Sequence, residues 1–539
     1  MVAPVYATDL TTQSDADSAA GWTRIGTGNP ISDTTFAIQG TQAIERTLNS
    51  GTSGAVHDNG SAIDLTGGNH IWVWAIMPAP GVADTLANGG VGISIGDGSA
   101  NYVLFHVEGA ETYKDSGRTG QCYPVSFVNT ANVTAPYRSL VGSPTAAPNF
   151  AGAECTVSGK AKFAIDAVRV GTGGYTVDGE VADPATWSGF STENSTSANT
   201  WGILIDLEGS LLLQGTFAIG RNSAGTAAAC YFEEDNIDVK AVDTVHSSAG
   251  FTEIIVDHAS TTWKQKNFNF KALGTNNRGK ITVNSANPTV DLTGGTFEGI
   301  GLSVWRSNTT LTRRTFLKCD KVELIGAGSF DSCILEESDA TIALAIEDLA
   351  YLTGGTFISA GTGHAVDLGT VASTVSMDWA ADDSGYAATD GSTGNETILV
   401  SVNTGITLTI NVATGASTPT IKNDGVGTVS VLVAPVTVGV TITDTDDVAI
   451  ENARVEISAT ETVGTVTSGD VLLTGLTNAS GILEDTSFTY ESAFDPTGLD
   501  ISIKARQGSV SPYKVPSTTT GTIVAGTGFS SVIALQPDE

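Results

Sequence analysis

The residues best suited to chemistry are carboxylates near the middle of the chain. They are Asp331, Glu336, Glu337, Asp339, Glu347 and Asp348. Glycoside hydrolysis needs two carboxylates about 5–10 Å apart, and neighbouring coils of a parallel β-helix, about 4.8 Å apart, would bring such residues together. However, an acidic outer face is ordinary in a chain with 58 acidic and 25 basic residues. The sequence favours a solvated acidic face, and cleavage of polysaccharide stays open as the alternative.

Two short motifs resemble catalytic or phosphate-binding loops without the structural context that such loops need. Ser94 stands in a G-x-S-x-G pattern, but it lies in an alternating strand with no helix after it, whereas a nucleophile elbow joins a strand to a helix. The run 274–280 nearly matches a P-loop. Ile281 replaces the Ser or Thr that would bind magnesium, and a strand pattern follows. We predict that neither motif is a site.

The sequence evidence for a metal site is equally weak. Asp444, Asp446 and Asp447 offer carboxylate oxygens of the kind that calcium prefers, but their spacing lacks the glycine and the distant glutamate of an EF-hand loop. An acidic turn is the better interpretation, with calcium binding left open. No zinc spacing occurs among the histidines at 57, 70, 106, 246, 258 and 364. We therefore predict no catalytic, cofactor-binding or metal site, no cofactor, and no enzyme activity.

The composition indicates strands and turns rather than helices. The chain has 539 residues, of which 62 are glycine and 15% are charged, and this length predicts several domains. A formal charge of −33 argues against nucleic acid as a partner, because phosphate binding needs clustered Lys and Arg. The N-terminus lacks the pattern of a secretion signal, and the most apolar run, 429–440, is too short to span a bilayer. We therefore expect no membrane insertion.

The cysteines also bear on where the chain is made. There are five, scattered along the sequence: Cys122, Cys155, Cys230, Cys319 and Cys333. Their odd number and spacing predict small buried side chains rather than a disulfide framework. We expect a protein made in a reducing cytosol.

Residues 1–180 show alternating apolar runs at 71–76, 91–95 and 102–107, with a hairpin turn predicted at 96–98. With 162–168 as a closing strand, this spacing resembles the laminin-G or concanavalin-like jelly roll. The resemblance implies an antiparallel sandwich. Trp72, Trp74 and Tyr102 could add to a partly aromatic binding surface, although aromatic residues on strands more often belong to the core.

Residues 181–435 contain the hexapeptide LTGGTF twice, at 292–297 and again at 352–357. Between the copies the pair Ser/Thr-apolar returns at 315–316, 329–330 and 341–342. This irregular repeat predicts a right-handed parallel β-helix, with Gly-Gly at a corner of the coil and the copies about four coils apart. We expect Phe297, Phe316, Phe330 and Phe357 to stack inside. Cys319 and Cys333 would occupy matching positions in neighbouring coils.

Residues 436–539 predict a small sandwich. The strands 436–442 and 453–457 are expected to form a hairpin around the acidic turn 443–447, followed by a turn at 476–481 and a strand at 499–505. The pattern resembles the immunoglobulin-like domain of the carboxypeptidase-regulatory or bacterial adhesin type.

An acidic all-β chain with a jelly roll, a β-helix and an Ig-like domain resembles the structural proteins of tailed-bacteriophage virions. The resemblance implies a fibre, spike or capsid-decorating protein, assembled in the host cytoplasm, with other virion proteins as partners and host surface glycan as a further contact. It also implies a homotrimer. Two alternatives stay open: a tailspike depolymerase that cleaves host surface polysaccharide on the β-helix, and a secreted bacterial adhesin.

Overall fold

The computed structural model confirms an all-β protein. It describes residues 3–536 except 27–30, 35–36, 38–39, 49–50, 67–68, 77–85, 107–121, 129–137, 145–146, 158, 160, 197–200, 202–203, 206–208, 214, 242–251, 273–278, 285–286, 339–340, 387–394, 414, 434, 492–493, 495–496, 509–514 and 525. Two compact units are formed: Met1–Ser329 with Leu335–Leu344, and Phe330–Ile334 with Ala345–Glu539. Strands β30 (Ser329–Asp331), β31 (Ile334–Ser338) and β32 (Ile342–Ala345) contain residues of both.

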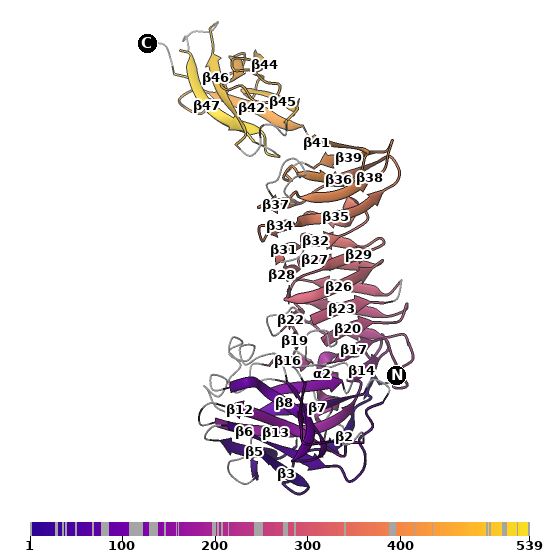
Figure 1. Ribbon diagram of the computed structural model, residues 1–539. Helices are drawn as coiled ribbons and strands as arrows, with labels where there is room; N and C mark the ends of the chain where they lie inside the picture. The colour runs from indigo at the N-terminus through magenta and orange to yellow at the C-terminus, as the bar shows by residue number, and fades with distance from the viewer. Residues whose placement is uncertain are drawn as a thin grey trace. The chain divides into compact units, whose positions relative to one another are not determined.

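The first unit begins with a sandwich of two antiparallel sheets (Figure 1). One sheet has the order β10 (Cys122–Val128), β7 (His70–Ile76), β13 (Ala161–Gly171), β5 (Ala43–Leu48), β4 (Ser32–Thr34), with β2 (Thr11–Ser14) also on β13. The other has the order β11 (Arg138–Val141), β9 (Asn101–His106), β8 (Leu86–Gly98), β12 (Phe150–Val157), β6 (Gly51–Asp58), β3 (Trp22–Gly26).

Alternation places one face of each sheet in a common apolar core. Ile71 and Val73 of β7, and Ile93 and Ile95 of β8, all belong to this core, as the period of two predicts. The predicted β8–β9 hairpin is confirmed, but its turn is not at 96–98. Strand β8 continues through Gly98, which pairs with Asn101 after a register shift. The turn therefore lies at 99–100, directly after the predicted position.

Parallel pairing begins at β14 (Gly174–Asp178), on which β1 (Val5–Thr8) pairs antiparallel. Three parallel ladders then run through the rest of the first unit, and in Figure 1 their strands follow one another as rungs. The first contains β14, β17 (Thr216–Ile219), β20 (Thr252–Val256), β23 (Gly279–Val283), β26 (Ile300–Arg306) and β29 (Val322–Ile325). The second contains β16 (Leu211–Leu213), β19 (Asp238–Ala241), β22 (Asn269–Ala272), β25 (Thr296–Glu298) and β28 (Thr315–Leu317), with β15 (Leu204–Ile205) antiparallel on β16. The third contains β18 (Tyr231–Glu233), β21 (Thr262–Lys266), β24 (Thr289–Thr293) and β27 (Thr309–Thr312).

Parallel pairs recur in the second unit. They join β30 to β33 (Leu352–Thr353), and β34 (Thr356–Ser359) to β37 (Asp382–Ser384). They also join β35 (His364–Val371), β38 (Ile398–Val402) and β40 (Ile421–Asn423), and, on a further sheet, β36 (Val375–Trp379), β39 (Thr407–Val412) and β41 (Thr428–Val433). Long parallel sheets of this kind are those of a β-helix. The exact domain limits, 180 and 435, stay predictions.

The coils are filled by apolar rings. Phe270, Phe297 and Phe316 are in register on successive strands, and the ring centroids of the last two lie 5.3 Å apart. The α-helix of the described residues, α2 (Trp187–Ser195), is capped by the Thr186 hydroxyl, which accepts from the Gly189 N–H at 2.8 Å. Trp187 stacks on Phe217 at 4.4 Å. Among the described residues no helix is long and apolar enough to cross a membrane.

The LTGGTF hexapeptide is a corner of the coil in both places, as predicted. In each copy Leu-Thr ends one strand, Gly-Gly turns with positive φ, and Thr-Phe begins the next strand. The φ angles are 64° and 83° at Gly294 and Gly295, and 75° and 113° at Gly354 and Gly355. One coil after the first copy, Leu311–Phe316 makes the same corner with Arg313 at φ 51°.

The interior position of the four phenylalanines is confirmed, because each is at most 1% exposed. Their assignment to one column is wrong for Phe330. It lies in β30 in register with Leu352, which is a leucine position of the corner. Coils therefore take 19 residues from Leu292 to Leu311 and 22 from Phe330 to Leu352, so the interval of 60 holds fewer than the four coils predicted.

The prediction that Cys319 and Cys333 occupy matching positions in neighbouring coils is wrong for the same reason. Cys333 stands at the corner, where its carbonyl accepts from the Thr356 N–H at 2.8 Å. Cys319 follows the phenylalanine strand instead, with its thiol 3.4 Å from the Phe297 carbonyl. The two thiols occupy different positions of the coil. Both are buried, as are Cys155 and Cys230, and none of these four is in a disulfide.

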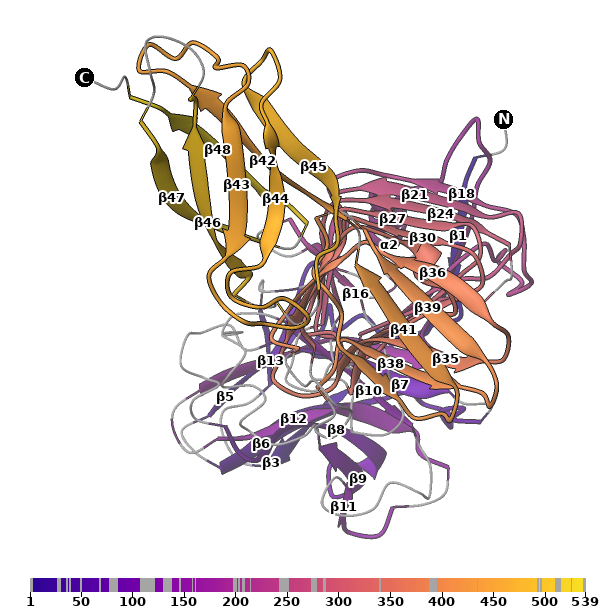
Figure 2. The same cartoon turned by 90° about the horizontal axis from the view of Figure 1, so that it is seen from above.

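The C-terminal part of the second unit is a sandwich of two sheets. One has the order β45 (Ile482–Phe488), β42 (Val436–Thr443), β48 (Phe529–Ala534), and the other β44 (Val471–Leu476), β43 (Arg454–Ala459), β46 (Leu499–Arg506), β47 (Ser517–Ile523). The predicted hairpin of 436–442 with 453–457 is wrong, because β42 and β43 belong to different sheets (Figure 2). Their apolar residues, such as Val440 and Ile457, face one core between the sheets.

Candidate functional site

Two of the acidic residues considered for hydrolysis, Asp331 and Asp348, accept local hydrogen bonds. Asp348 caps the 3-10 turn η2 (Leu349–Tyr351) and accepts from the Ala350 N–H at 2.9 Å. Asp331 accepts from the Ser332 hydroxyl at 3.0 Å. Glu347 is exposed. Glu336 is half-buried, whereas Asp339 and the side chain of Glu337 lie outside the described residues.

Neither motif with a catalytic resemblance has the geometry of its class. Ser94 is fully buried inside β8 and pairs with Leu104 and Gly152 of the neighbouring strands. Of the loop 274–280, the first five residues lie outside the described part. Lys280 lies on strand β23 and forms an ion pair with Glu253 at 2.9 Å. Ser94 is a strand residue, as predicted, whereas the loop expected over 274–280 ends earlier, because β23 already begins at Gly279.

The acidic turn at 444–447 is held by a hydrogen-bonding carboxylate of its own, that of Asp444. One oxygen of Asp444 accepts from the N–H groups of Asp446 and Val448, at 2.9 and 3.0 Å. Asp447 has φ 60°, a conformation that aspartate tolerates better than most residues. In the described part of the chain no three His, Cys, Asp or Glu side chains gather as a metal site would require.

The three aromatic residues proposed for a binding surface are buried. Trp72 and Trp74 are 6% and 3% exposed. The indole N–H of Trp72 donates to the Gly171 carbonyl at 2.9 Å. Its ring fills the space beside Gly173, where an added Cβ would lie 1.9 Å from it. Trp72 therefore contacts the end of β13 through a hydrogen bond and through packing, and its side chain is not available to a ligand.

Tyr102 belongs to the site that the sequence did not reveal. Its hydroxyl donates to the Glu154 carboxylate at 2.6 Å, although the two residues are 52 positions apart. The register of the sheet explains the contact. Glu154 pairs with Gly92 on one side and Gly54 on the other, while Tyr102 pairs with Gly96. Glycines on the outer face of these strands leave the room in which the tyrosine side chain reaches the carboxylate.

The Tyr102–Glu154 pair lies in an apolar setting. Both residues are 4% exposed, and Tyr102 packs with Ile25, Val56 and Leu104. Burial raises the pKa of Glu154, and the hydrogen bond from Tyr102 opposes that rise. Burial and the neighbouring carboxylate both raise the pKa of Tyr102. A carboxyl with a raised pKa can donate a proton, but here its hydrogen-bond donor is a phenol, and glycoside hydrolysis needs a second carboxylate.

A second set of interacting polar residues lies in the second unit. His364 and Glu396 are 3% and 0% exposed, and the His364 Nδ1 lies 2.8 Å from the Glu396 carbonyl oxygen. Nearby in the chain, the Thr397 hydroxyl donates to Asp383, and burial raises the pKa of that carboxyl. These contacts join the residues just before β38 to strands β35 and β37.

One sequence signal for the Tyr102–Glu154 site existed. Gly92, Ser94 and Gly96 are alternate residues, which places all three on one face of a strand. The G-x-S-x-G pattern therefore describes a flat face of small side chains rather than a nucleophile elbow. What sequence could not supply is the strand register that brings Glu154 to this face.

Comparison with known proteins gives only distant likenesses. No family model and no curated protein matches the chain. A family 11 carbohydrate-binding module from Clostridium thermocellum, in complex with a β-1,3-1,4-mixed-linked tetrasaccharide, is 10% identical with a TM-score of 0.22, covering 30% of this chain and 96% of that one. The family 11 module of the cellulosomal cellulase Lic26A-Cel5E of the same organism is 10% identical with a TM-score of 0.21, covering 30% of this chain and 95% of that one.

For a third solved structure the match covers a smaller share of the other chain. The CBM22-1 and GH10 modules of the C. thermocellum xylanase 10B, complexed with xylohexaose, are 18% identical with a TM-score of 0.17, covering 31% of this chain and 28% of that one. Likenesses this weak assign the chain to no family and tell nothing of its ligand.

Proposed function

We propose that the chain is a non-enzymatic structural protein of a tailed-bacteriophage particle, assembled in the host cytoplasm and displayed on the particle as a fibre, spike or capsid decoration. In this proposal its partners are other virion proteins, and its sandwich domains contact host surface glycans. The proposal rests on the combination of an antiparallel sandwich, long parallel sheets and a second sandwich in one strongly acidic chain.

The observation that carries the proposal is the filled interior of the coils. Phe297 is fully buried, with Phe316 at 5.3 Å, Trp305 at 5.7 Å and Phe268 at 6.2 Å between ring centroids. Each coil buries its apolar rings against the next one, so no coil can open without exposing those of its neighbours. A stack of hydrogen-bonded coils with a packed interior suits a protein that must stay folded outside a cell.

The contacts of the acidic residues support a structural role over the depolymerase alternative. Asp348 holds a turn, and Asp331 accepts from an adjacent serine. A glycosidase needs a pair of carboxylates in which one has a raised pKa. Three carboxyls of the described residues have raised pKa values, those of Glu154, Asp178 and Asp383, with burial as the largest cause. Glu154 and Asp383 accept hydrogen bonds from the hydroxyls of Tyr102 and Thr397. Asp178 pairs with Val5 of the neighbouring strand.

The test is to locate the protein on intact particles. Antibodies against the purified chain, carrying gold, would be imaged on particles purified from lysates of the source culture, with pre-immune serum as control. We expect gold at one repeated position on tailed particles, and peptides of the chain in the purified particle band. Gold confined to the surface of intact cells, with none on particles, would overturn the proposal and favour the adhesin alternative.

A further inference from the structure

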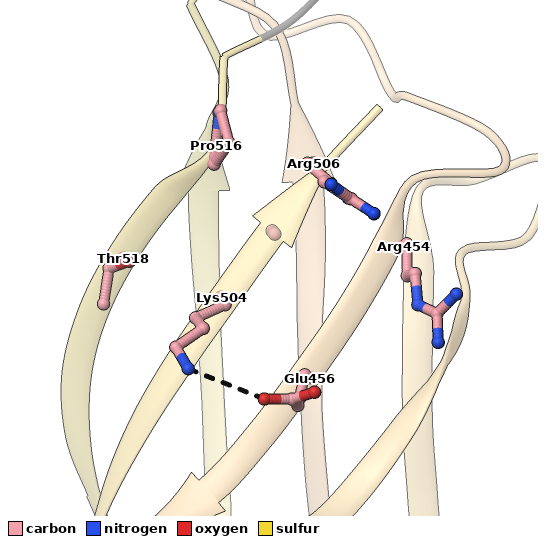
Figure 3. A pocket seen from close by; sticks show the side chains of 7 residues that line it. Arg454, Glu456, Lys504, Arg506, Pro516 and Thr518 are labelled. Atoms are coloured by element: carbon pink, nitrogen blue, oxygen red, sulfur yellow. Dashed lines mark ion pairs between the residues drawn. The ribbon is translucent and has the colours of Figure 1, made fainter. Parts of the chain in front are cut away.

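The described basic residues of the C-terminal sandwich lie together at one place. Residues 436–539 contain four basic side chains, at 454, 504, 506 and 514, among many acidic ones. Arg454, Lys504 and Arg506 line a single open pocket of about 530 Å³ on the outer face of the sheet β44-β43-β46-β47 (Figure 3). Lys514 lies outside the described residues. Such a concentration on an acidic chain calls for a physical explanation.

The strand register brings the cations together. Arg454 of β43 and Arg506 of β46 are direct partners, and Glu456 is the partner of Lys504. The residues between them, Val455 among them, are buried in the core, so the charged ones share the solvent face. Like charges placed directly opposite each other destabilise a sheet. The Arg454–Arg506 pair is therefore a cost to the fold.

Acidic neighbours neutralise the pocket only in part. Glu456 forms an ion pair with Lys504 at 3.7 Å, which Figure 3 shows as the dashed line. Within the described part of the chain, neither Arg454 nor Arg506 has an ion pair, and both side chains are exposed. Two guanidinium groups thus remain to bind an anion, and each offers a planar fork that fits carboxylate or sulfate through two hydrogen bonds.

The rest of the face is rich in hydroxyl groups. Thr518, partner of Lys504, lines the pocket. Further along the strands the same face continues with Ser458, Ser502 and Thr520, which are partners in one row across the sheet. Serine and threonine both donate and accept hydrogen bonds, as sugar hydroxyls do. No aromatic ring is among the described residues that line the pocket, whereas the centres of protein interfaces are enriched in aromatic residues.

We propose that this outer face binds an anionic polysaccharide, with Arg454 and Arg506 holding a carboxylate or sulfate group and the serine and threonine rows contacting the sugar hydroxyls. This inference specifies the chemistry of the glycan contact in the proposed function, but its argument rests on the pocket alone. An enzyme, a fibre or an adhesin could each carry such a site.

The test measures binding of the full chain to soluble polysaccharides by titration calorimetry. Polygalacturonate supplies carboxylates, dextran sulfate supplies sulfates, and unmodified dextran supplies hydroxyls alone. The double variant Arg454→Gln/Arg506→Gln removes the pair. A matched control, Arg24→Gln/Lys264→Gln, removes the same charge from exposed strand positions of the first unit. Poly-glutamate tests an acidic protein partner.

We expect one or both acidic polysaccharides to bind and dextran not to bind. The pocket variant should bind about tenfold more weakly or worse, whereas the control should bind as the wild type does. Because the variant relieves repulsion between exposed arginines, its thermal midpoint should not fall, which separates lost binding from lost folding. Equal binding by both variants, or binding of poly-glutamate alone, would overturn the inference.

Discussion

Replacing Gly295 by alanine should destabilise the coils far more than the same change at another glycine of similar conformation. Gly295 has φ 83° in the LTGGTF corner. An added Cβ would lie 2.4 Å from the Phe268 carbonyl oxygen and 2.9 Å from a guanidinium nitrogen of Arg314. The Gly295 carbonyl also accepts from the Thr315 N–H at 3.1 Å. The corner cannot move away from the clash without disturbing the coils on both sides.

The magnitude follows from comparing two positions. Gly225 has φ 73°, and nothing lies within 4 Å of its added Cβ. Both changes incur about 1–2 kcal/mol for a left-handed conformation, offset by about 0.4–1 kcal/mol from the stiffer unfolded chain. Gly225→Ala should therefore cost between about 0 and 1.6 kcal/mol. Gly295→Ala adds the backbone clash, and we expect it to cost about 1–3 kcal/mol more than Gly225→Ala, the range of overpacked cores.

Urea unfolding monitored by tryptophan fluorescence measures both variants. Trp305 is fully buried, and its ring lies 5.7 Å from that of Phe297, the last residue of the same corner, so it reports directly on these coils. The midpoint and slope of each transition give the free energy of unfolding. A difference below about 0.5 kcal/mol between the variants would refute the account of this corner.

Three further predictions address the core, the buried carboxyl and the chemistry. Phe330→Ala should cost roughly 3–5 kcal/mol in denaturant unfolding because the ring is fully buried; a loss under about 1 kcal/mol would place it at the surface. Because burial raises the pKa of Glu154, the folded state keeps this proton longer, so stability should fall as the pH rises from about 4.3. Glu154→Gln should make that fall shallower, and an unchanged pH profile would contradict the assignment. Host capsular polysaccharide and lipopolysaccharide incubated with the protein should keep their chain length, whereas shortening that Asp331→Asn abolishes would establish the depolymerase.

The oligomeric state forms a separate prediction. We expect a homotrimer, in which apolar burial between chains exceeds the repulsion of their −33 charges, because salt screens that repulsion over about 8–10 Å. Native mass measurement of the purified chain tests this, and a monomer at all concentrations would count against it.

Local patterns predicted single elements well and their partners less well. The alternation at 71–76 identified β7, and Gly-Gly identified the corner at 294–295, because both depend on nearby residues only. Phe330 was placed in the wrong column because Thr-Phe and Ser-Phe look alike, while the position on a coil depends on every loop length before it. Val440 and Ile457 were assigned to one hairpin because sequence does not show when a chain changes sheets.

The Tyr102–Glu154 contact shows the same limit. Each residue looks ordinary in its own strand, and the pair exists only because two strand registers place glycines between them. Arg454 and Arg506 likewise look like scattered surface charges until antiparallel pairing sets them opposite each other. Sites made by register across a sheet leave little trace in a linear sequence.

The buried cysteines bear on how the protein would age. Burial raises the pKa of the Cys230 and Cys319 thiols to about 12 and also raises that of Cys155. With a pKa near 12, roughly one thiol in 10⁵ is ionised at neutral pH, and only the thiolate reacts quickly with oxidants and disulfides. A chain folded in a reducing compartment could therefore pass into air with these thiols intact. Its durability would then come from burial of these sulfur atoms.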